Sequence, residues 1–337
     1  MNIYSLKHLP TILLCLCSST YLFSQDELLI RGEPQKIVLK NNWATYELKG
    51  KVKKCVDYEV WQMENNSGIL VDRDKKKGSL SFNERGYLIG KKEFKSNGGV
   101  RCIDSYLYKD DKKVADLFIL YEGDTVSMKH IGKFTYHDDG LCIDYKFKFQ
   151  PDKVLKYCSK REEVSKKEAI FSTTINEYSD KIHEFYDERG FLDSLYATQD
   201  LTAPSKLSAK FYRDNNGVLL KTVADRSSMA DGNELDGHSE ITYSYHDNAT
   251  LKNYQWFRNG VLNKVVEFDS NGNLLGIFIF KNDKLYMKEE YSYTFDDHKN
   301  WIEKQSTTTY FESKSFNKER KVVFNYKREI AYYTKEK

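Results

Sequence analysis

Apolar and polar residues alternate along much of the second half of the chain, with the period of two that is typical of β-strands. In residues 285–295 the odd positions are mostly apolar and the intervening positions mostly charged or hydroxyl-bearing; the apolar set is Leu285, Met287, Tyr291, Tyr293 and Phe295. Residues 322–332 repeat this pattern. Each segment is therefore predicted to be a strand with one buried face.

A short turn motif separates these strands. It has an aromatic residue at its first position, glycine at its fifth and leucine at its seventh, and it occurs at residues 82–88, 186–192 and 268–274. Two further copies, residues 212–219 and 295–302, are interpreted as the motif with one extra turn residue. A strand that ends in an aromatic residue, a glycine turn and a strand that resumes with leucine form a β-hairpin. The glycines, Gly190 and Gly272 among them, are expected to have positive φ.

The spacing of the turns predicts the fold. Turn signals at Asn248, Gly260, Gly272 and Asn282 lie 12, 12 and 10 residues apart, which leaves room for one strand of about eight residues per interval. We therefore expect an all-β fold: a repetitive antiparallel β-meander that forms a curved, twisted and extended sheet. Few prolines and no low-complexity spacer favour a single continuous domain over residues 25–337.

Other segments allow more specific predictions. Residues 43–61 indicate an opening strand pair, and the charged residues 72–78 indicate a loop tip. Residues 160–169 suit either a short helix or a polar edge strand or connector. Residues 274–280 are apolar at both odd and even positions, so we expect this strand to be covered on both of its faces. Residues 198–206 and 226–237 are predicted to be loops.

The first 24 residues have the pattern of an export signal. Lys7 precedes the apolar stretch 12–16, which is too short to span a bilayer, and Ser24 offers a cleavage point before Gln25. A lipid anchor at Cys15 or Cys17 is an alternative, although leucine precedes each of them. The sequence thus predicts a soluble protein that is periplasmic, on the outer surface or secreted, with no transmembrane span after the signal.

Composition narrows the classes of partner and fold. A net charge of +3 gives no nucleic-acid footprint, and 25 Tyr and 19 Phe beside 31% charged residues suit sheets with one aromatic and one wet face. Cysteines at 55, 102, 142 and 158 follow the signal. Cys142 and Cys158 are candidates for a disulfide on one solvent face of neighbouring strands, and four unpaired thiols are the alternative.

The turn units, above all residues 186–190 and 268–272, resemble the YD repeats of the bacterial Rhs-like family. Residues 295–302 look like a degenerate unit in which Asn300 replaces the turn glycine. The resemblance implies a repeat scaffold and says little about function. Encapsulation of a toxin is not implied, because the shells of that family need many more units. A weaker similarity, at residues 257–262, is to the asparagine-glycine repeats of bacterial MORN-like antitoxin proteins.

Catalytic motifs are absent from the sequence, which has no GxSxG elbow, P-loop, HExxH or dinucleotide fingerprint. No cofactor or metal is predicted, although turn histidines 137, 246 and 298 could in principle align along one edge. Trp256 and Trp301 flank turn signals and are the candidate ligand contacts, with core packing as the alternative for each. We expect an exported, non-enzymatic scaffold that binds an envelope polysaccharide or protein. The alternatives are a carbohydrate-active hydrolase with acids from separate strands and a purely structural envelope protein.

Overall fold

The structure, a computed structural model, describes residues 43–64, 70–95, 97–108, 117–122, 128–137, 140–147, 150–175, 178–198, 206–225, 238–311 and 319–334. In these residues the chain is all-β, with one 20-stranded sheet and a single turn of 3-10 helix, η1 (Trp43–Tyr46). The predicted export signal and the predicted loop 226–237 lie outside the described residues, and so does the predicted loop 198–206 apart from its two end residues. The predicted fold class is confirmed.

The strands follow one another in chain order. Their bounds are β1 Val52–Glu64, β2 Leu70–Phe82, β3 Leu88–Phe94, β4 Val100–Leu107, β5 Leu117–Glu122, β6 Met128–His137, β7 Gly140–Phe147, β8 Gln150–Ser165, β9 Glu168–Ile175, β10 Tyr178–Tyr186, β11 Leu192–Thr198, β12 Lys206–Arg213, β13 Leu219–Asp225, β14 His238–Tyr245, β15 Leu251–Arg258, β16 Val261–Phe268, β17 Leu274–Lys281, β18 Lys284–Phe295, β19 Trp301–Tyr310 and β20 Arg320–Tyr332.

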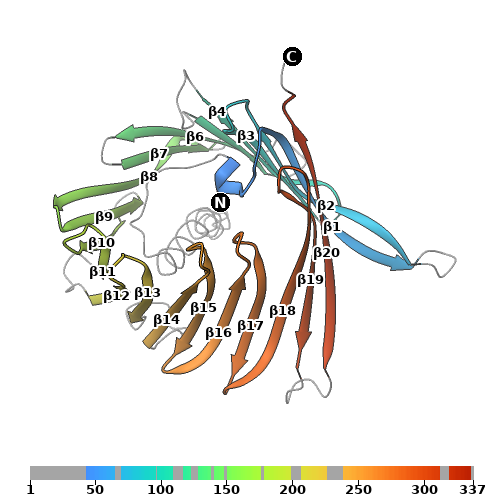
Figure 1. Cartoon of the computed structure of the whole chain (residues 1–337). Coiled ribbons are helices and arrows are strands. Elements are labelled where there is room, and N and C mark those ends of the chain that lie inside the picture. The colour runs from blue at the N-terminus through green and yellow to red at the C-terminus, as the bar shows by residue number, and fades with distance from the viewer. Residues whose placement is uncertain are drawn as a thin grey trace, which may run out of the picture.

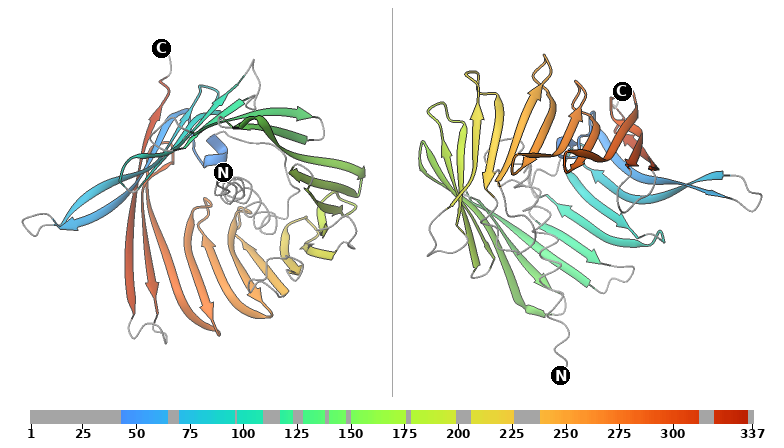
Figure 2. Two further views of the ribbon diagram at one scale, coloured as in Figure 1. Left: turned by 180° about the vertical axis from the view of Figure 1, so that it is seen from behind. Right: turned by 90° about the horizontal axis from the view of Figure 1, so that it is seen from below.

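Every strand pairs antiparallel with the strand before it and the strand after it. In addition, β20 pairs with β1, from Val52 with Tyr332 to Val60 with Asn325. The series of pairings thus returns to its first strand, and the strands are arranged in a ring (Figures 1 and 2). Neither end of the meander is left as a complete edge strand.

One turn geometry repeats through the sheet. In the β10–β11 turn the Asp187 carboxylate accepts the backbone N–H groups of Arg189 at 2.9 Å and Phe191 at 3.0 Å. Two backbone hydrogen bonds close the turn, and Gly190 has a φ of 84°. The same backbone closure occurs at residues 82–88, 94–100, 213–219, 245–251, 268–274 and 295–301. The prediction of positive φ at Gly190 and Gly272 is confirmed.

The two copies interpreted as one residue longer are in fact the same length as the others. The positive-φ residue is Gly217 in one and Lys299 in the other, each three residues after the aspartate that accepts the turn N–H groups. Lys299, not Asn300, therefore occupies the glycine position of the β18–β19 turn. The aromatic residue of the motif was assigned to Tyr212, whereas the turn begins at Arg213.

Tyrosine hydroxyls connect successive hairpins. Tyr245 donates to the carbonyl oxygen of Leu219 at 2.7 Å, and Tyr293 donates to that of Leu274 at 2.9 Å. In each case the acceptor is the leucine that ends the preceding turn. The leucine position of the motif thus helps to fix one hairpin against the next; the tyrosine is the aromatic position of its own turn at Tyr245 and lies two residues before that position at Tyr293.

The charged residues 72–78, predicted as a loop tip, lie inside β2. They form a strand because they pair along their length with β1, for example Asp74 with Val60, and cross-strand pairing overrides the local turn preference. The opening strand pair predicted at residues 43–61 is instead η1 followed by a single strand, β1. Residues 160–169 form the β8–β9 hairpin. Of the two alternatives, a short helix or a polar strand or connector, the strand is therefore correct.

Two clusters of buried apolar residues stabilise the ring. One lies on β10–β14 and comprises Ile182, Leu192, Leu195, Ala209, Phe211, Leu219, Ala224, Ile241 and Tyr243. The other comprises Leu48, Val52, Cys55, Phe82 and Leu88, with Trp43, Tyr46 and Ile330 packed against it. Because η1 lies inside the ring (Figure 1), the face of β1 and β20 that carries Cys55 and Ile330 points inward.

Asn300, in the β18–β19 turn, joins this hairpin to Lys49, which precedes β1, and to Tyr332 of β20. Its side chain is 2% exposed. The amide oxygen accepts the N–H of Lys49 at 2.7 Å, and the amide nitrogen donates to the carbonyl of Lys49 at 2.8 Å and to the Tyr332 hydroxyl at 2.7 Å. Tyr332 in turn donates to Asp296 and stacks on His298, with ring centroids 4.1 Å apart. This cluster, Lys49, Asp296, His298, Asn300 and Tyr332, is the seam cluster.

We expect Gly272→Val to lower the free energy of unfolding by ~1–2 kcal/mol more than Ser270→Val, because a β-branched residue is strained at positive φ. A Cβ at Gly272 would have no atom within 4 Å, so backbone strain is the only cost. Thermal melting of the two variants is the measurement. Equal melting temperatures would contradict the turn assignment.

We expect Asn300→Ala to destabilise the protein by about 1–3 kcal/mol, because it leaves buried hydrogen-bonding groups of the seam cluster without a partner. Asn273 holds the same turn position in the β16–β17 hairpin and donates only to Asp269 of its own turn, at 2.7 Å. Asn273→Ala is therefore the matched control in chemical denaturation. A cost as small for Asn300→Ala as for the control would show that the seam contributes nothing.

Candidate binding groove

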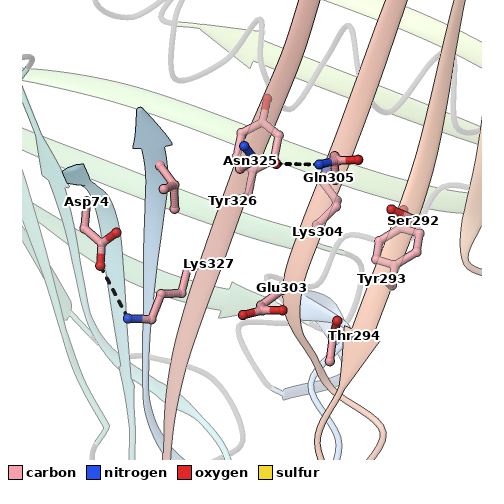
Figure 3. A pocket seen from close by; sticks show the side chains of 11 residues that line it. Asp74, Ser292, Tyr293, Thr294, Glu303, Lys304, Gln305, Asn325, Tyr326 and Lys327 are labelled. Atoms are coloured by element: carbon pink, nitrogen blue, oxygen red, sulfur yellow. Dashed lines mark hydrogen bonds and ion pairs between the residues drawn. The ribbon is translucent and has the colours of Figure 1, made fainter. Parts of the chain in front are cut away.

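An open groove crosses the outer surface of β18, β19, β20, β1 and β2. It has a volume of about 750 Å³. Its lining consists largely of hydroxyl, amide and charged side chains (Figure 3): Val60, Asp74, Ser292, Tyr293, Thr294, Glu303, Lys304, Gln305, Asn325, Tyr326 and Lys327. Alternate residues of a strand point to opposite faces, so Gln305, Asn325 and Lys327 face outward, opposite to the inward parity of Cys55 and Ile330.

The polar groups of the groove are aligned across strands. Ser292 lies opposite Gln305, Gln305 opposite Asn325, and Asn325 opposite Val60. The Gln305 amide donates to Asn325 Oδ1 at 2.9 Å. Gln305 is exposed and Asn325 is half-buried, and the hydrogen bond between them is exposed, so the remaining donors and acceptors of the two amides face the groove. The row offers a ligand several hydrogen-bonding groups at fixed spacing.

An ion pair borders this row. Lys327 Nζ lies 3.3 Å from Asp74 Oδ2 and 3.5 Å from Glu329 Oε1. The hydrogen bond that Lys327 donates to Asp74, together with the charge of Asp74, raises the pKa of Lys327. Lys327 therefore stays protonated and holds the Asp74 carboxylate at the groove wall. The Tyr58 ring lies beside the same ammonium group: Lys327 Nζ is 6.0 Å from the centroid of this ring.

Three of the lining residues, Tyr293, Lys304 and Tyr326, have the opposite parity to Gln305 and Asn325, so their side chains point to the inward face, which carries aromatic rings and cations. Lys304 Nζ lies 4.9 Å from the ring centroid of Tyr326, 5.1 Å from that of Tyr291 and 5.9 Å from that of Trp301. Burial lowers the pKa of Lys304, Glu289 opposes this shift, and Arg328 adds to it. The rings stabilise an ammonium group that has lost part of its hydration.

The two tryptophans predicted as ligand contacts lie on different parts of the sheet. Trp301 is covered by the Arg328 guanidinium, 3.7 Å from the ring centroid, and Arg328 Nε also donates to Asp57 Oδ1 at 2.8 Å. Trp256 packs against the β10–β14 apolar cluster. The structure does not bring the two rings together, and neither lines the groove.

Cys142 and Cys158 are joined by a disulfide between β7 and β8, with Cα atoms 4.1 Å apart. They are directly opposite each other in the strand register. Cys142 is 5% exposed, so the bridge does not lie on a fully solvent-exposed face as the alternation suggested. Cys55 and Cys102 are free thiols.

The described residues contain no group of three or more His, Cys, Asp or Glu side chains that could hold a metal ion. His246 Nε2 lies 3.0 Å from the Phe268 carbonyl oxygen, and His298 is stacked on Tyr332. The two turn histidines thus have separate structural contacts. Within the same residues, no helix has the length and apolar character needed to cross a membrane.

The groove was not predicted from the sequence, although the alternation of residues in one of its strands indicated part of its polar face. Alternation placed Ser292 and Thr294 on the polar face of their strand. It could not show that this face continues onto β19, β20 and β1, because the register between distant strands is set by tertiary pairing.

No protein-family model and no curated protein matches the chain. Among solved structures, a porin-like protein from Bacteroides uniformis matches over 84% of this chain and 98% of its own, at 10% identity and a TM-score of 0.33. The Tc holotoxin pore of Photorhabdus luminescens matches over 77% of this chain and 16% of its own, at 11% identity and a TM-score of 0.35. A TcdB2-TccC3 structure matches over 75% of this chain and 16% of its own, at 10% identity and a TM-score of 0.33. At these values the likeness assigns neither a family nor a function.

Proposed function

We propose that the protein is an exported, non-catalytic β-repeat scaffold that binds a polysaccharide chain in the groove across β18–β20, β1 and β2. The observation that carries this proposal is the aligned row of outward hydroxyl and amide groups, Ser292, Gln305 and Asn325, bordered by the Asp74–Lys327 ion pair.

The chemistry of the row suits sugars. Each sugar hydroxyl can donate and accept a hydrogen bond, and amide side chains offer both functions. The row is held on paired strands, so little side-chain and backbone order has to be gained on binding. An open groove of this kind accepts the middle of a long chain as readily as its end. A polymer is therefore a better fit than a small enclosed ligand.

The arrangement of acids favours binding over hydrolysis. Glycoside hydrolysis needs two carboxyl groups that flank one bond, and one of them acts as a general acid. In the groove Asp74 is engaged with Lys327 at 3.3 Å, and Glu303 comes from β19. The hydrolase alternative predicts turnover by these acids, and the binding proposal predicts none.

The test is a panel of soluble polysaccharides, measured for both saturable binding and release of reducing ends. We expect binding without turnover. The double variant Gln305→Ala with Asn325→Ala should lose about tenfold or more in affinity, because two hydrogen bonds of ~1 kcal/mol each are removed.

The matched control is Gln255→Ala with Asn253→Ala, which removes the same two residue types from β15. It should bind as the wild type does. Turnover that disappears with Glu303→Gln would establish the hydrolase. If no polysaccharide on the panel binds saturably, the proposal is wrong, and a protein partner or a structural envelope role remains.

Trp301→Ala and Trp256→Ala test the contacts predicted from the sequence. Trp301 lies under Arg328 and Trp256 against an apolar cluster, so both substitutions are expected to lower the melting temperature and to leave affinity unchanged once the variants are folded. A normally folded Trp301→Ala variant that loses the ligand would move the binding surface to the inward face of the ring.

Export is the part of the proposal that the N-terminal sequence supports. We expect the native protein to begin at or near Gln25, because a basic start and a short apolar stretch precede Ser24. Intact-mass measurement of the native protein checks this. A mass that retains residues 1–24, or a diacylglycerol adduct on Cys15 or Cys17, would contradict soluble export.

A further inference from the structure

β1 and β20 separate beyond the end of their pairing and form a fork. Their last pair is Val60 with Asn325. Past this point β1 continues to Glu64, paired with β2, and β20 extends back to Arg320, paired with β19. In Figure 1 the β1–β2 hairpin projects away from the ring, and the line of β20 diverges from it.

Each arm of the fork has a strand edge. Among the described residues, 320–324 of β20 pair with β19 alone, and 61–64 of β1 pair with β2 alone. On an edge strand every second residue directs its N–H and C=O away from its one neighbour. These groups are a template for pairing with another strand.

The β20 edge is charged at its outer end, at Arg320 and Lys321, and apolar in the part nearest the start of the fork. Its central residues are Val322, Val323 and Phe324, and Val323 is 51% exposed. The far edge of the β1–β2 hairpin, on β2, differs from the β20 edge. There, β2 pairs with β3 only from Gly78 onward, and residues 72–77 of its edge are all charged. Charge of this kind suppresses unwanted strand pairing, so residues 72–77 of β2 are protected along their whole length, whereas residues 322–324 of β20 form an apolar stretch.

We propose that the fork is a binding site for an extended peptide segment of a partner protein, which adds to β20 as a further strand. A single extended strand is narrow enough to enter between two diverging strands, and the edges of β20 and β1 offer it backbone partners on both sides. The segment carries apolar residues on alternate positions, which pack against the β20 side chains.

The charged residues at the start of β20 favour an acidic residue at one end of the bound segment. Arg320 and Lys321 are exposed at the start of β20, with Glu319 3.5 Å from Lys321 as the only acid paired with them in the described residues. The segment therefore carries an acidic residue opposite Arg320. This site lies beside the polysaccharide groove, and the two share Val60 and Asn325 where the fork begins.

The probes are synthetic seven-residue peptides in which valine and threonine alternate. One peptide has glutamate at both ends, and a second has lysine at both ends. Two more are the glutamate peptide with every second backbone nitrogen methylated, one for each of the two alternating registers. We expect the glutamate peptide to bind about tenfold or more tightly than the lysine peptide. One of the two methylation registers should abolish binding, because it removes the N–H groups that pair with β20.

Hydrogen exchange locates the peptide on the intact protein. Amides in residues 320–324 should exchange about tenfold or more slowly when the glutamate peptide is bound. Amides of β15 should be unaffected. Binding that leaves exchange in residues 320–324 unchanged would overturn strand addition, and so would absence of binding by all the peptides at about 1 mM.

Val322→Pro and Val323→Pro form a matched pair. Successive N–H groups of a strand point to opposite sides, so one proline removes a bond to β19 and the other removes only a group that faces the fork. The variant that melts like the wild type should lose the peptide and keep polysaccharide binding, whereas Gln305→Ala with Asn325→Ala should keep the peptide. A normally melting variant that binds the peptide as the wild type does would overturn the proposal. If both variants melt early, the exchange measurement on the wild type decides.

Discussion

The pairing of β20 with β1 is the contact on which the rest of the structure depends. A meander of hairpins is stabilised by neighbours in sequence, and its two end strands would each leave a full edge unpaired. Here the end strands pair with each other from Val52 to Val60, and the seam cluster fixes the β18–β19 turn against residue 49. The groove exists because this pairing places β18–β20 beside β1 and β2.

The repeated turn makes the long sheet regular. An aspartate or asparagine carboxyl or amide oxygen accepts the turn N–H groups, and a residue with positive φ follows. The next hairpin is then fixed by tyrosine hydroxyls on the leucine carbonyls. Because each unit contacts mainly its neighbours, the array can vary in one hairpin without disturbing distant ones. Asn300 shows such variation: its turn position is retained, and its side chain is used for the seam instead of its own turn.

Groove and fork arise from the same local feature. β1, β2 and β20 are each 13 residues long, and β1 and β20 both continue beyond their last shared pair, Val60 with Asn325. Where β1 is paired with β20, the outward polar residues align into a row; where that pairing ends, backbone edges are exposed. One site thus offers side-chain hydrogen bonds and the other offers main-chain hydrogen bonds. The two proposals together describe a scaffold that holds a polysaccharide and a protein segment side by side.

The sequence by itself determined the strands, the turn motif and the positive φ of Gly190 and Gly272, because alternation and turn chemistry are local properties of a few residues. It also placed Ser292 and Thr294 on a polar face. Only the tertiary structure decided that residues 72–78 are a strand and that β20 meets β1. It also decided that Asn300 is buried at the seam and that Trp301 lies under Arg328. Each of these depends on contacts between residues far apart in the chain, and such contacts leave no period in the sequence around either partner.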